Sequence, residues 1–123
     1  MLPVGTSFLL PSYPSKTEHL YILVAVKESA GKALMVNVTT PKDGCDESCK
    51  LALGEHRFLK YDSVINYADS RIVNISDIEQ AISYNIAKPH DPFENELLKR
   101  IQAGGLISPA ISFKHLTFLS ENI

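Results

Sequence analysis

The segment LYILVAVKESAGKALMVNV, residues 20–38, places two apolar runs on either side of a polar turn. The first run, Leu20–Val26, is rich in large and β-branched residues and is too short for a typical helix, which favours a strand. The turn around Gly31 fits a hairpin, and Leu34–Val38 returns as the partner strand. Pro41 stops that strand because proline lacks the backbone donor that a sheet needs. The segment therefore predicts a β-hairpin.

Shorter strand signals flank this hairpin on both sides. Gly5–Leu10 is apolar and is followed by a loop from Pro11 to Ser15 that is rich in proline and serine. Downstream, Ser63–Tyr67 and Arg71–Ile75 form a second candidate hairpin, separated by the turn-like residues 68–70. The first half of the chain thus predicts about five strands.

The second half of the chain carries three helix-start signals. Residues 76–79, Ser-Asp-Ile-Glu, match a capping box, and Asp91-Pro92 pairs a cap residue with proline at the first helical position. Gly104-Gly105 is expected to end the helix that follows, and Ser108-Pro109 repeats the start signal before a third helix. Strands followed by helices indicate one α+β domain over residues 1–123, mainly β, with a small barrel or sheet of about five strands followed by three helices.

Composition places the chain among single globular domains. It has 123 residues, of which 45% are hydrophobic and 21% charged, so it can bury a core without metal or disulfide support. Twelve Lys and Arg against fourteen Asp and Glu give a net charge of -2, which excludes the uniform basic field of a non-specific nucleic-acid binder. Any contact with nucleic acid must therefore be local.

Three sequence features favour a cytoplasmic protein. The longest apolar run, Leu20–Val26, is far shorter than the roughly 20 residues of a membrane-spanning helix. The N-terminal residues before Pro11 contain no Lys or Arg and do not resemble a secretory signal. The two cysteines, Cys45 and Cys49, fit a reducing compartment with free thiols. We therefore expect a protein of the cytoplasm with no membrane segment.

Polar residues gather at the ends of the predicted strands. They are His19, Thr39, Thr40, His56, Arg57, Lys60 and Ser63. If these strand ends meet at one rim, an imidazole could take the proton of an RNA 2′-hydroxyl while another group protonates the leaving oxygen. Arg57 or Lys60 could stabilise the charge that develops on the phosphate oxygens, and nothing in the set needs a metal.

The predicted catalytic residues are therefore His19, Thr39, Thr40 and His56. The predicted substrate-binding residues are Arg57, Lys60 and Ser63, and we expect no metal or other cofactor. Polar strand ends also occur in small β domains that only bind a partner. A non-enzymatic binding module is the alternative.

Cys45, Cys49 and His56 raise the separate possibility of a zinc site. A structural zinc needs four ligands, and the second ligand pair of the usual spacing is missing, although a nearby Asp or His19 is a candidate donor. A short disulfide and two plain thiols are the other interpretations. The sequence contains no glycine-rich nucleotide loop and no His-Glu-x-x-His motif.

Four short segments of the chain, taken in their order along the sequence, form a recognisable pattern. They are VGTSFLL (residues 4–10), HLYILV (19–24), LMVNVTT (34–40), and DSVI (62–65) followed by RIV (71–73). In this order they resemble the PemK/MazF family of toxins from bacterial toxin–antitoxin systems, which are SH3-like barrels with attached helices. The resemblance covers about residues 4–82. Together with the helix signals of the second half of the chain, it predicts a small SH3-like barrel of about five strands followed by three helices.

The resemblance also implies an activity. It implies sequence-selective, metal-independent cleavage of single-stranded RNA by 2′-hydroxyl attack, in a homodimer that a protein antitoxin inhibits. The family's active-site Arg is matched here by His19, its following Pro by Leu20, and its catalytic Thr by Thr39 or Thr40. Either His19 takes over the acid/base role with Arg57 supplying charge, or the fold persists without the activity. We therefore expect a toxin-like endoribonuclease, with a protein-binding or regulatory module on the same barrel as the alternative.

Overall fold

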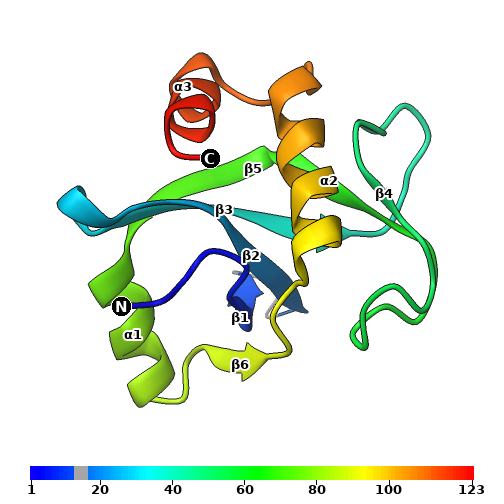
Figure 1. Cartoon of the computed structure of the whole chain (residues 1–123). Helices are drawn as coiled ribbons and strands as arrows, with labels where there is room; N and C mark the ends of the chain where they lie inside the picture. The colour runs from blue at the N-terminus through cyan, green and yellow to red at the C-terminus, as the bar shows by residue number, and fades with distance from the viewer. Residues whose placement is uncertain (13–16) are drawn as a thin grey trace.

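A curled antiparallel sheet organises the chain, whose computed structural model describes residues 1–12 and 17–123 (Figure 1). Within these residues the sheet has six strands, in the spatial order β4-β5-β3-β2-β1-β6. The strands are β1 (Ser7–Ser12), β2 (Thr17–Lys27), β3 (Lys32–Thr39), β4 (Lys50–Leu51), β5 (Ser63–Asn74) and β6 (Lys88–His90). The predicted α+β class, mainly strands with three helices in the second half, is confirmed. Two short strands were not predicted: β4, which pairs with β5, and β6, which pairs with β1 after the first helix.

The hairpin predicted from residues 20–38 is confirmed as β2 and β3. The two strands pair from Lys27 with Lys32 to Tyr21 with Asn37, and a short 3-10 turn, Glu28–Ala30, joins them. Gly31 ends this turn with φ 62°, a left-handed conformation that costs glycine little. Both strands are almost continuously buried along their middles, as their apolar sequences require.

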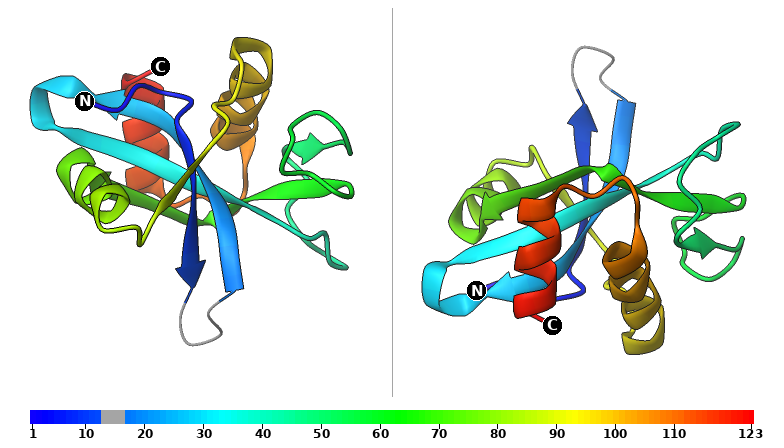
Figure 2. Two further views of the ribbon diagram at one scale, coloured as in Figure 1. Left: turned by 90° about the horizontal axis from the view of Figure 1, so that it is seen from below. Right: turned by 90° about the horizontal axis from the view of Figure 1, so that it is seen from above.

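The predicted hairpin over residues 63–75 is wrong, because residues 63–74 form one long strand, β5, and Ile75 begins α1. Both halves of β5 pair with β3, through Asn37 with Asn66 and Met35 with Arg71, and three extra residues of β5 bulge out between the two pairs. Asn37 Nδ2 donates a hydrogen bond of 2.8 Å to Asp69 Oδ2 across this bulge. A bulge of this kind bends a strand, and the bend helps the sheet to curl (Figure 2).

The loop predicted over residues 11–15 is wrong at Pro11 and Ser12. Strand β1 continues through Ser12, where it pairs with Thr17 of β2. The remainder of that loop, residues 13–16, lies outside the described residues.

Three α-helices follow the main strands: α1 (Ile75–Ser83), α2 (Asn95–Ile107) and α3 (Phe113–Glu121). All three were predicted, but their first residues differ from the sequence signals. The capping box at 76–79 does not form, because α1 begins directly after Asn74, whose side chain binds Lys32 and Asp77 instead. Helix α3 is capped by Ser112, which accepts a hydrogen bond from the His115 amide.

Helix α2 departs from the prediction at both ends. Asp91 does not cap it, since its carbonyl and carboxylate bind other parts of the chain, and the helix begins after Glu94. Gly104 and Gly105 do not end it either. They lie buried within the helix where Tyr67 packs, and a Cβ on Gly104 would lie 2.4 Å from the Tyr67 hydroxyl oxygen. The two glycines therefore serve close helix–sheet packing rather than termination.

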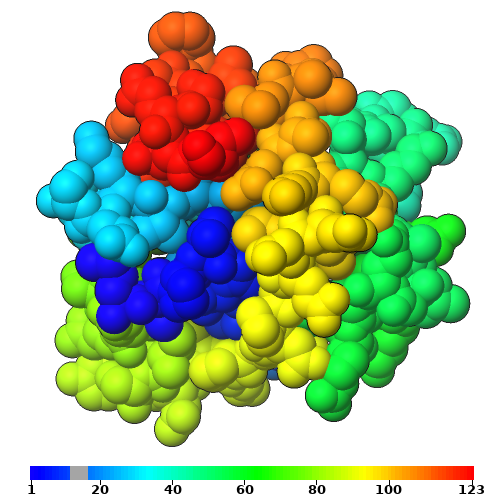
Figure 3. All heavy atoms as spheres, viewed as in Figure 1, coloured from blue at the N-terminus to red at the C-terminus, as the bar shows by residue number. Residues whose placement is uncertain are grey.

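The core has two parts, one on each face of the sheet. Residues of α2 and α3, among them Ile101 and Leu119, pack with Leu20 and Ile65 on one face. Helix α1 covers the other face through Ile75 and Ile78. In the space-filling view, α2 and the segment before it, in yellow, lie against the green loop that precedes β5 (Figure 3). No helix in the described part of the chain has the length and apolar character needed to cross a membrane.

Candidate functional site

A cavity of about 500 Å³ lies where β2 begins and β3 ends, and we call it the strand-end cavity. The loop before β5 and the end of β6 complete its walls. The lining residues are Thr17, Glu18, His19, Val38, Thr39, Thr40, Arg57, Phe58, Leu59, Lys60, Tyr61, Ser63 and His90. A cavity of this size can hold one or two nucleotide-sized groups.

Six of the seven predicted site residues line this cavity: His19, Thr39, Thr40, Arg57, Lys60 and Ser63. The hairpin explains the first three, because the pairing of Tyr21 with Asn37 brings the start of β2 beside the end of β3. Arg57 and Lys60 lie on the loop that leads into β5, and Ser63 is the first residue of β5, next to Val64, which pairs with Thr39.

This loop, residues 52–62, is held in place by its own polar groups. Glu55 Oε1 accepts a hydrogen bond of 2.7 Å from the Ala52 amide, and Asp62 Oδ1 accepts one of 2.9 Å from the Leu53 amide. Arg100 of α2 binds the other carboxylate oxygen of Glu55, which ties the loop to the helix. The loop that carries Arg57 and Lys60 is thus held in place by hydrogen bonds and by its contact with α2.

His19 is half-buried, and its ring makes no hydrogen bond to any residue of the described ranges 1–12 and 17–123. Both ring nitrogens are therefore available to a ligand. The hydroxyls of Thr40 and Ser63 are less free, because Thr40 Oγ1 lies 3.2 Å from the Tyr61 hydroxyl and the buried Ser63 donates to the Tyr61 carbonyl at 3.2 Å. His19 is the imidazole best placed to exchange a proton within this cavity.

The charged groups of the cavity favour an anion. Arg57 forms an ion pair of 3.2 Å with Asp91, but its side chain remains 83% exposed. Lys60 is exposed and has no ion pair within the part of the chain that the structure describes. The one carboxylate among the lining residues, Glu18, is paired with Lys88 at 3.4 Å. The acidic chain therefore has a local cationic site.

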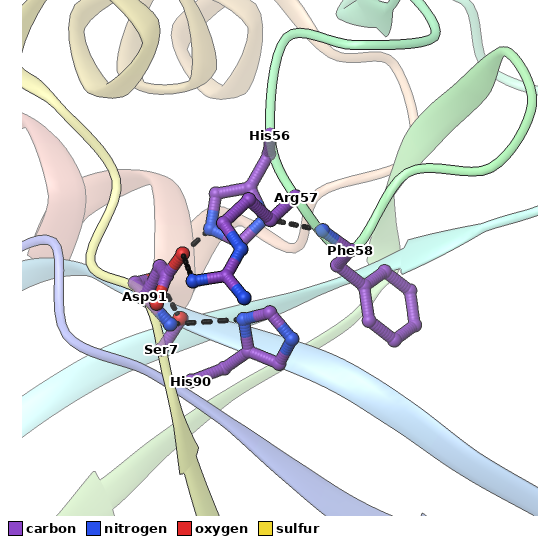
Figure 4. Close-up of polar contacts among 6 residues, drawn as sticks. All are labelled: Ser7, His56, Arg57, Phe58, His90 and Asp91. Atoms are coloured by element: carbon purple, nitrogen blue, oxygen red, sulfur yellow. Dashed lines mark hydrogen bonds and ion pairs between the residues drawn. The ribbon is translucent and has the colours of Figure 1, made fainter.

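His56 lies outside this lining, although the sequence predicted it as catalytic. It is only 8% exposed, and its ring stacks on Phe93 with centroids 4.2 Å apart. Its Nδ1 accepts a hydrogen bond of 3.1 Å from the Phe58 amide, so the proton is on Nε2, which donates to the Asp91 carbonyl at 2.8 Å (Figure 4). Both nitrogens are occupied by backbone, and His56 joins the loop to the segment before α2.

His90, at the end of β6, lines the cavity and was not predicted. Its Nδ1 accepts a hydrogen bond of 2.9 Å from the Asp91 amide (Figure 4). Burial, together with the nearby His56 ring and Arg57, lowers the pKa of His90, so the ring is neutral near pH 7 and carries its proton on Nε2. His90 can therefore donate a hydrogen bond to a ligand. A strand as short as β6 leaves no periodic signal in the sequence.

The aromatic residues Phe58 and Tyr61 also line the cavity and were not among the predicted site residues. Phe58 is half-buried and meets the His90 ring edge-on at 5.8 Å. Tyr61 is 57% exposed. In the sequence, only their residue type pointed to a place in the site, and that evidence is weak because an aromatic residue near a strand end more often belongs to the core.

Cys45 and Cys49 are both free thiols. Cys49 is buried, and burial raises the pKa of its thiol. Residues 1–12 and 17–123 contain no group of three or more His, Cys, Asp and Glu side chains that could hold a metal ion. The zinc interpretation therefore finds no ligand set there.

No protein-family model matches the chain, and no curated protein matches it either. The resemblance to the PemK/MazF toxins therefore stays a prediction. What the geometry itself provides is a cationic cavity with one unengaged imidazole, hydroxyl groups beside it, and a neutral histidine that can donate a hydrogen bond.

Proposed function

We propose that the strand-end cavity binds single-stranded RNA and cleaves it without a metal ion, by attack of a 2′-hydroxyl on the neighbouring phosphate. The observation that carries this proposal is the position of His19, an imidazole with both nitrogens unengaged by described residues, in the same cavity as Arg57 and Lys60. A base and two cations are the groups that this reaction requires.

In the proposed reaction His19 takes the proton of the 2′-hydroxyl. The 2′-oxygen then forms a bond to phosphorus, and the bond from phosphorus to the 5′-oxygen breaks. The Lys60 ammonium protonates that leaving oxygen, while Arg57 and the His90 Nε2–H stabilise the charge on the non-bridging oxygens. The products are a 2′,3′-cyclic phosphate and a 5′-hydroxyl; solvent then removes the acquired proton from His19 and returns a proton to Lys60.

The donor chemistry of the cavity supports a reaction that proceeds without a metal. Divalent metals that act on phosphates are held by carboxylates and other oxygen ligands. Here the carboxylate of Glu18 is paired with Lys88, and the other charged groups of the lining are cations. A divalent cation would be repelled where a phosphate is attracted.

In this proposal His56 and Ser7 act as positioning residues. The Asp91 carbonyl accepts hydrogen bonds from His56 Nε2 at 2.8 Å and from Ser7 Oγ at 2.5 Å. Asp91 in turn pairs with Arg57 and donates its amide to His90. Anchoring Asp91 thus sets the positions of Arg57 and His90, which lie beside it (Figure 4).

The resemblance to the PemK/MazF toxins extends the proposal beyond the cavity. It supports a toxin-like protein of the cytoplasm that forms a homodimer and is inhibited by a protein antitoxin. A sedimentation measurement of the purified protein tests the dimer independently of cleavage. A mass near 13.6 kDa at all concentrations would contradict this part of the proposal.

A non-enzymatic binding module is the second candidate. The observation that favours it is that two of the three histidines around the site, His56 and His90, have Nδ1 occupied by backbone amides. Such a site has one base and no second free imidazole, and it could bind a phosphate strand without cutting it.

The deciding experiment incubates purified protein with a long unstructured RNA in excess EDTA and maps the product ends. Specific cuts with cyclic phosphate ends are expected, and His19→Ala should slow them by about 100-fold or more while the protein stays folded. His115→Asn, which changes a histidine on α3 outside the cavity, is the matched control. Absence of cutting by the unaltered protein, or equal cutting by His19→Ala, would refute the catalytic proposal.

A further inference from the structure

Tyr61 presents an exposed aromatic ring at the strand-end cavity, unlike the aromatic residues of the core. Its side chain is 57% exposed, whereas Tyr21, Tyr67, Phe8 and Phe93 are each less than 5% exposed. It nevertheless lines the strand-end cavity, next to Lys60. An exposed aromatic ring beside a cation is the combination that single-stranded nucleic-acid sites use, because the ring stacks on a base while the cation binds a phosphate.

Two contacts fix the orientation of Tyr61. Its hydroxyl lies 3.2 Å from Thr40 Oγ1, at the end of β3, and its carbonyl accepts a hydrogen bond of 3.2 Å from Ser63 Oγ, at the start of β5. The ring is therefore held at both its hydroxyl end and its backbone. A ring that is already oriented loses little conformational entropy when a base stacks on it.

The other aromatic ring of the cavity is less available. Phe58 is half-buried, packs against the main core, and meets the His90 ring edge-on at 5.8 Å. Its faces are in part occupied by the protein itself. Tyr61 is thus the ring whose surface a ligand can cover.

We infer that Tyr61 is a stacking platform for one unpaired base of the RNA strand, and that it restricts the site to single strands. The inference rests on the proposed function, since it takes the neighbouring phosphate to lie at Arg57 and Lys60. In a duplex each base is stacked on its neighbours and paired, so it cannot turn onto the ring. Thr40 acts here as a positioning residue, through its contact with the Tyr61 hydroxyl.

The test measures binding rather than cleavage. The probe is a fluorescein-labelled RNA hexamer with 2′-O-methyl sugars, which cannot undergo 2′-hydroxyl attack, and a second probe has the same phosphates with abasic sugars. Fluorescence anisotropy gives the Kd of each probe for the unaltered protein and for Tyr61→Leu. Tyr84→Leu is the matched control, because Tyr84 is 67% exposed and lies after α1 outside the cavity.

Tyr61→Leu should weaken binding of the base-bearing hexamer by about 5- to 150-fold, the usual range for loss of one stacked base. It should leave binding of the abasic probe unchanged, and Tyr84→Leu should change neither Kd. Tyr61→Phe keeps the ring and should lose less than Tyr61→Leu.

Four results would overturn the inference. Equal binding of the hexamer by Tyr61→Leu and the unaltered protein would refute stacking and leave the proposed cleavage standing. If Tyr61→Leu weakened the binding of the base-bearing and abasic probes equally, the substitution would have changed the cavity in general and not removed a stacking contact. Tighter binding of a double-stranded probe would refute the restriction to single strands. Failure of the unaltered protein to bind either probe would refute this inference and the proposed function together.

Discussion

Replacement of His56 by Ala should destabilise the protein strongly, because His56 is a buried connection between distant segments. The Phe58 amide would lose its acceptor, which costs about 1–3 kcal/mol for a group away from water. The Asp91 carbonyl keeps its hydrogen bond from Ser7, so the loss there is about 1 kcal/mol. Loss of the ring that stacks on Phe93 removes about 1 kcal/mol more. The expected loss in the free energy of unfolding is about 3–5 kcal/mol, a large part of the stability of a small domain.

Two conservative variants separate these contributions. His56→Asn keeps an acceptor near the position of Nδ1 and should restore the contact with the Phe58 amide. His56→Gln keeps a donor near the position of Nε2 and should restore the contact with the Asp91 carbonyl. We expect Asn to recover more stability than Gln, because the Asp91 carbonyl has a second donor in Ser7.

Urea unfolding at pH 7.5, followed by circular dichroism, measures the free energy of unfolding of each variant. RNA cleavage is measured in parallel at a temperature where every variant is folded. An unchanged urea midpoint for His56→Ala together with lost cleavage would refute the positioning role. That result would instead support the catalytic role that the sequence predicted for His56.

Three further predictions concern the packing of the helices. Gly104→Ala should destabilise the protein by about 1–3 kcal/mol despite the better helix propensity of Ala, because the added methyl would lie 2.4 Å from the Tyr67 hydroxyl; a raised Tm would contradict this. Burial and, to a smaller extent, the charge of Lys114 lower the pKa of His115, whose Nδ1 lies 2.7 Å from Ser70 Oγ. Because the unfolded chain then binds a proton more readily than the folded protein, His115 contributes stability above pH 6.5 that is lost as the pH falls through its lowered pKa. The urea midpoint should therefore fall less between pH 7.5 and pH 5 in His115→Asn than in the unaltered protein, and an equal fall in both would refute the linkage. Ser112→Ala should remove the cap of α3 and lower the free energy of unfolding by about 1 kcal/mol, whereas no change in the urea midpoint would show that the cap contributes nothing.

The central hairpin and the convergence of the site could be predicted because both depend on local sequence. Two apolar runs around a short turn leave few alternatives to antiparallel pairing, and Pro41 marks where the second strand must stop. Once β2 and β3 pair, His19 and Thr39 necessarily lie at the same end of the hairpin. Sequence was therefore sufficient to bring most of the candidate site together.

The continuous strand β5 could not be predicted from its own residues. Ala68-Asp69-Ser70 has the composition of a turn, and in isolation the chain would be free to reverse there. It does not reverse because both halves of the strand find partners on β3, and because Asn37 binds Asp69 across the bulge. The deciding contacts come from residues about thirty positions earlier in the chain.

The two glycines of α2 show the same dependence on distant partners. A Gly-Gly pair ordinarily favours the end of a helix, since glycine is a poor helix former and readily adopts left-handed conformations. Here the absence of a side chain allows Tyr67 to reach the helix and donate a hydrogen bond of 2.6 Å to the Ile101 carbonyl. The packing gained against β5 outweighs the local preference.

The sequence by itself determined the α+β class, the central hairpin and the set of polar residues at its open end. Only the tertiary structure decided which imidazole of that set remains free. His56 and His19 are the same residue type, and the sequence predicted both to lie near strand ends, but a ring nitrogen is available only if no backbone group occupies it. The groups that occupy both nitrogens of His56 are the Phe58 amide beside it and the Asp91 carbonyl, which the packing of the segment before α2 brings from the other half of the chain.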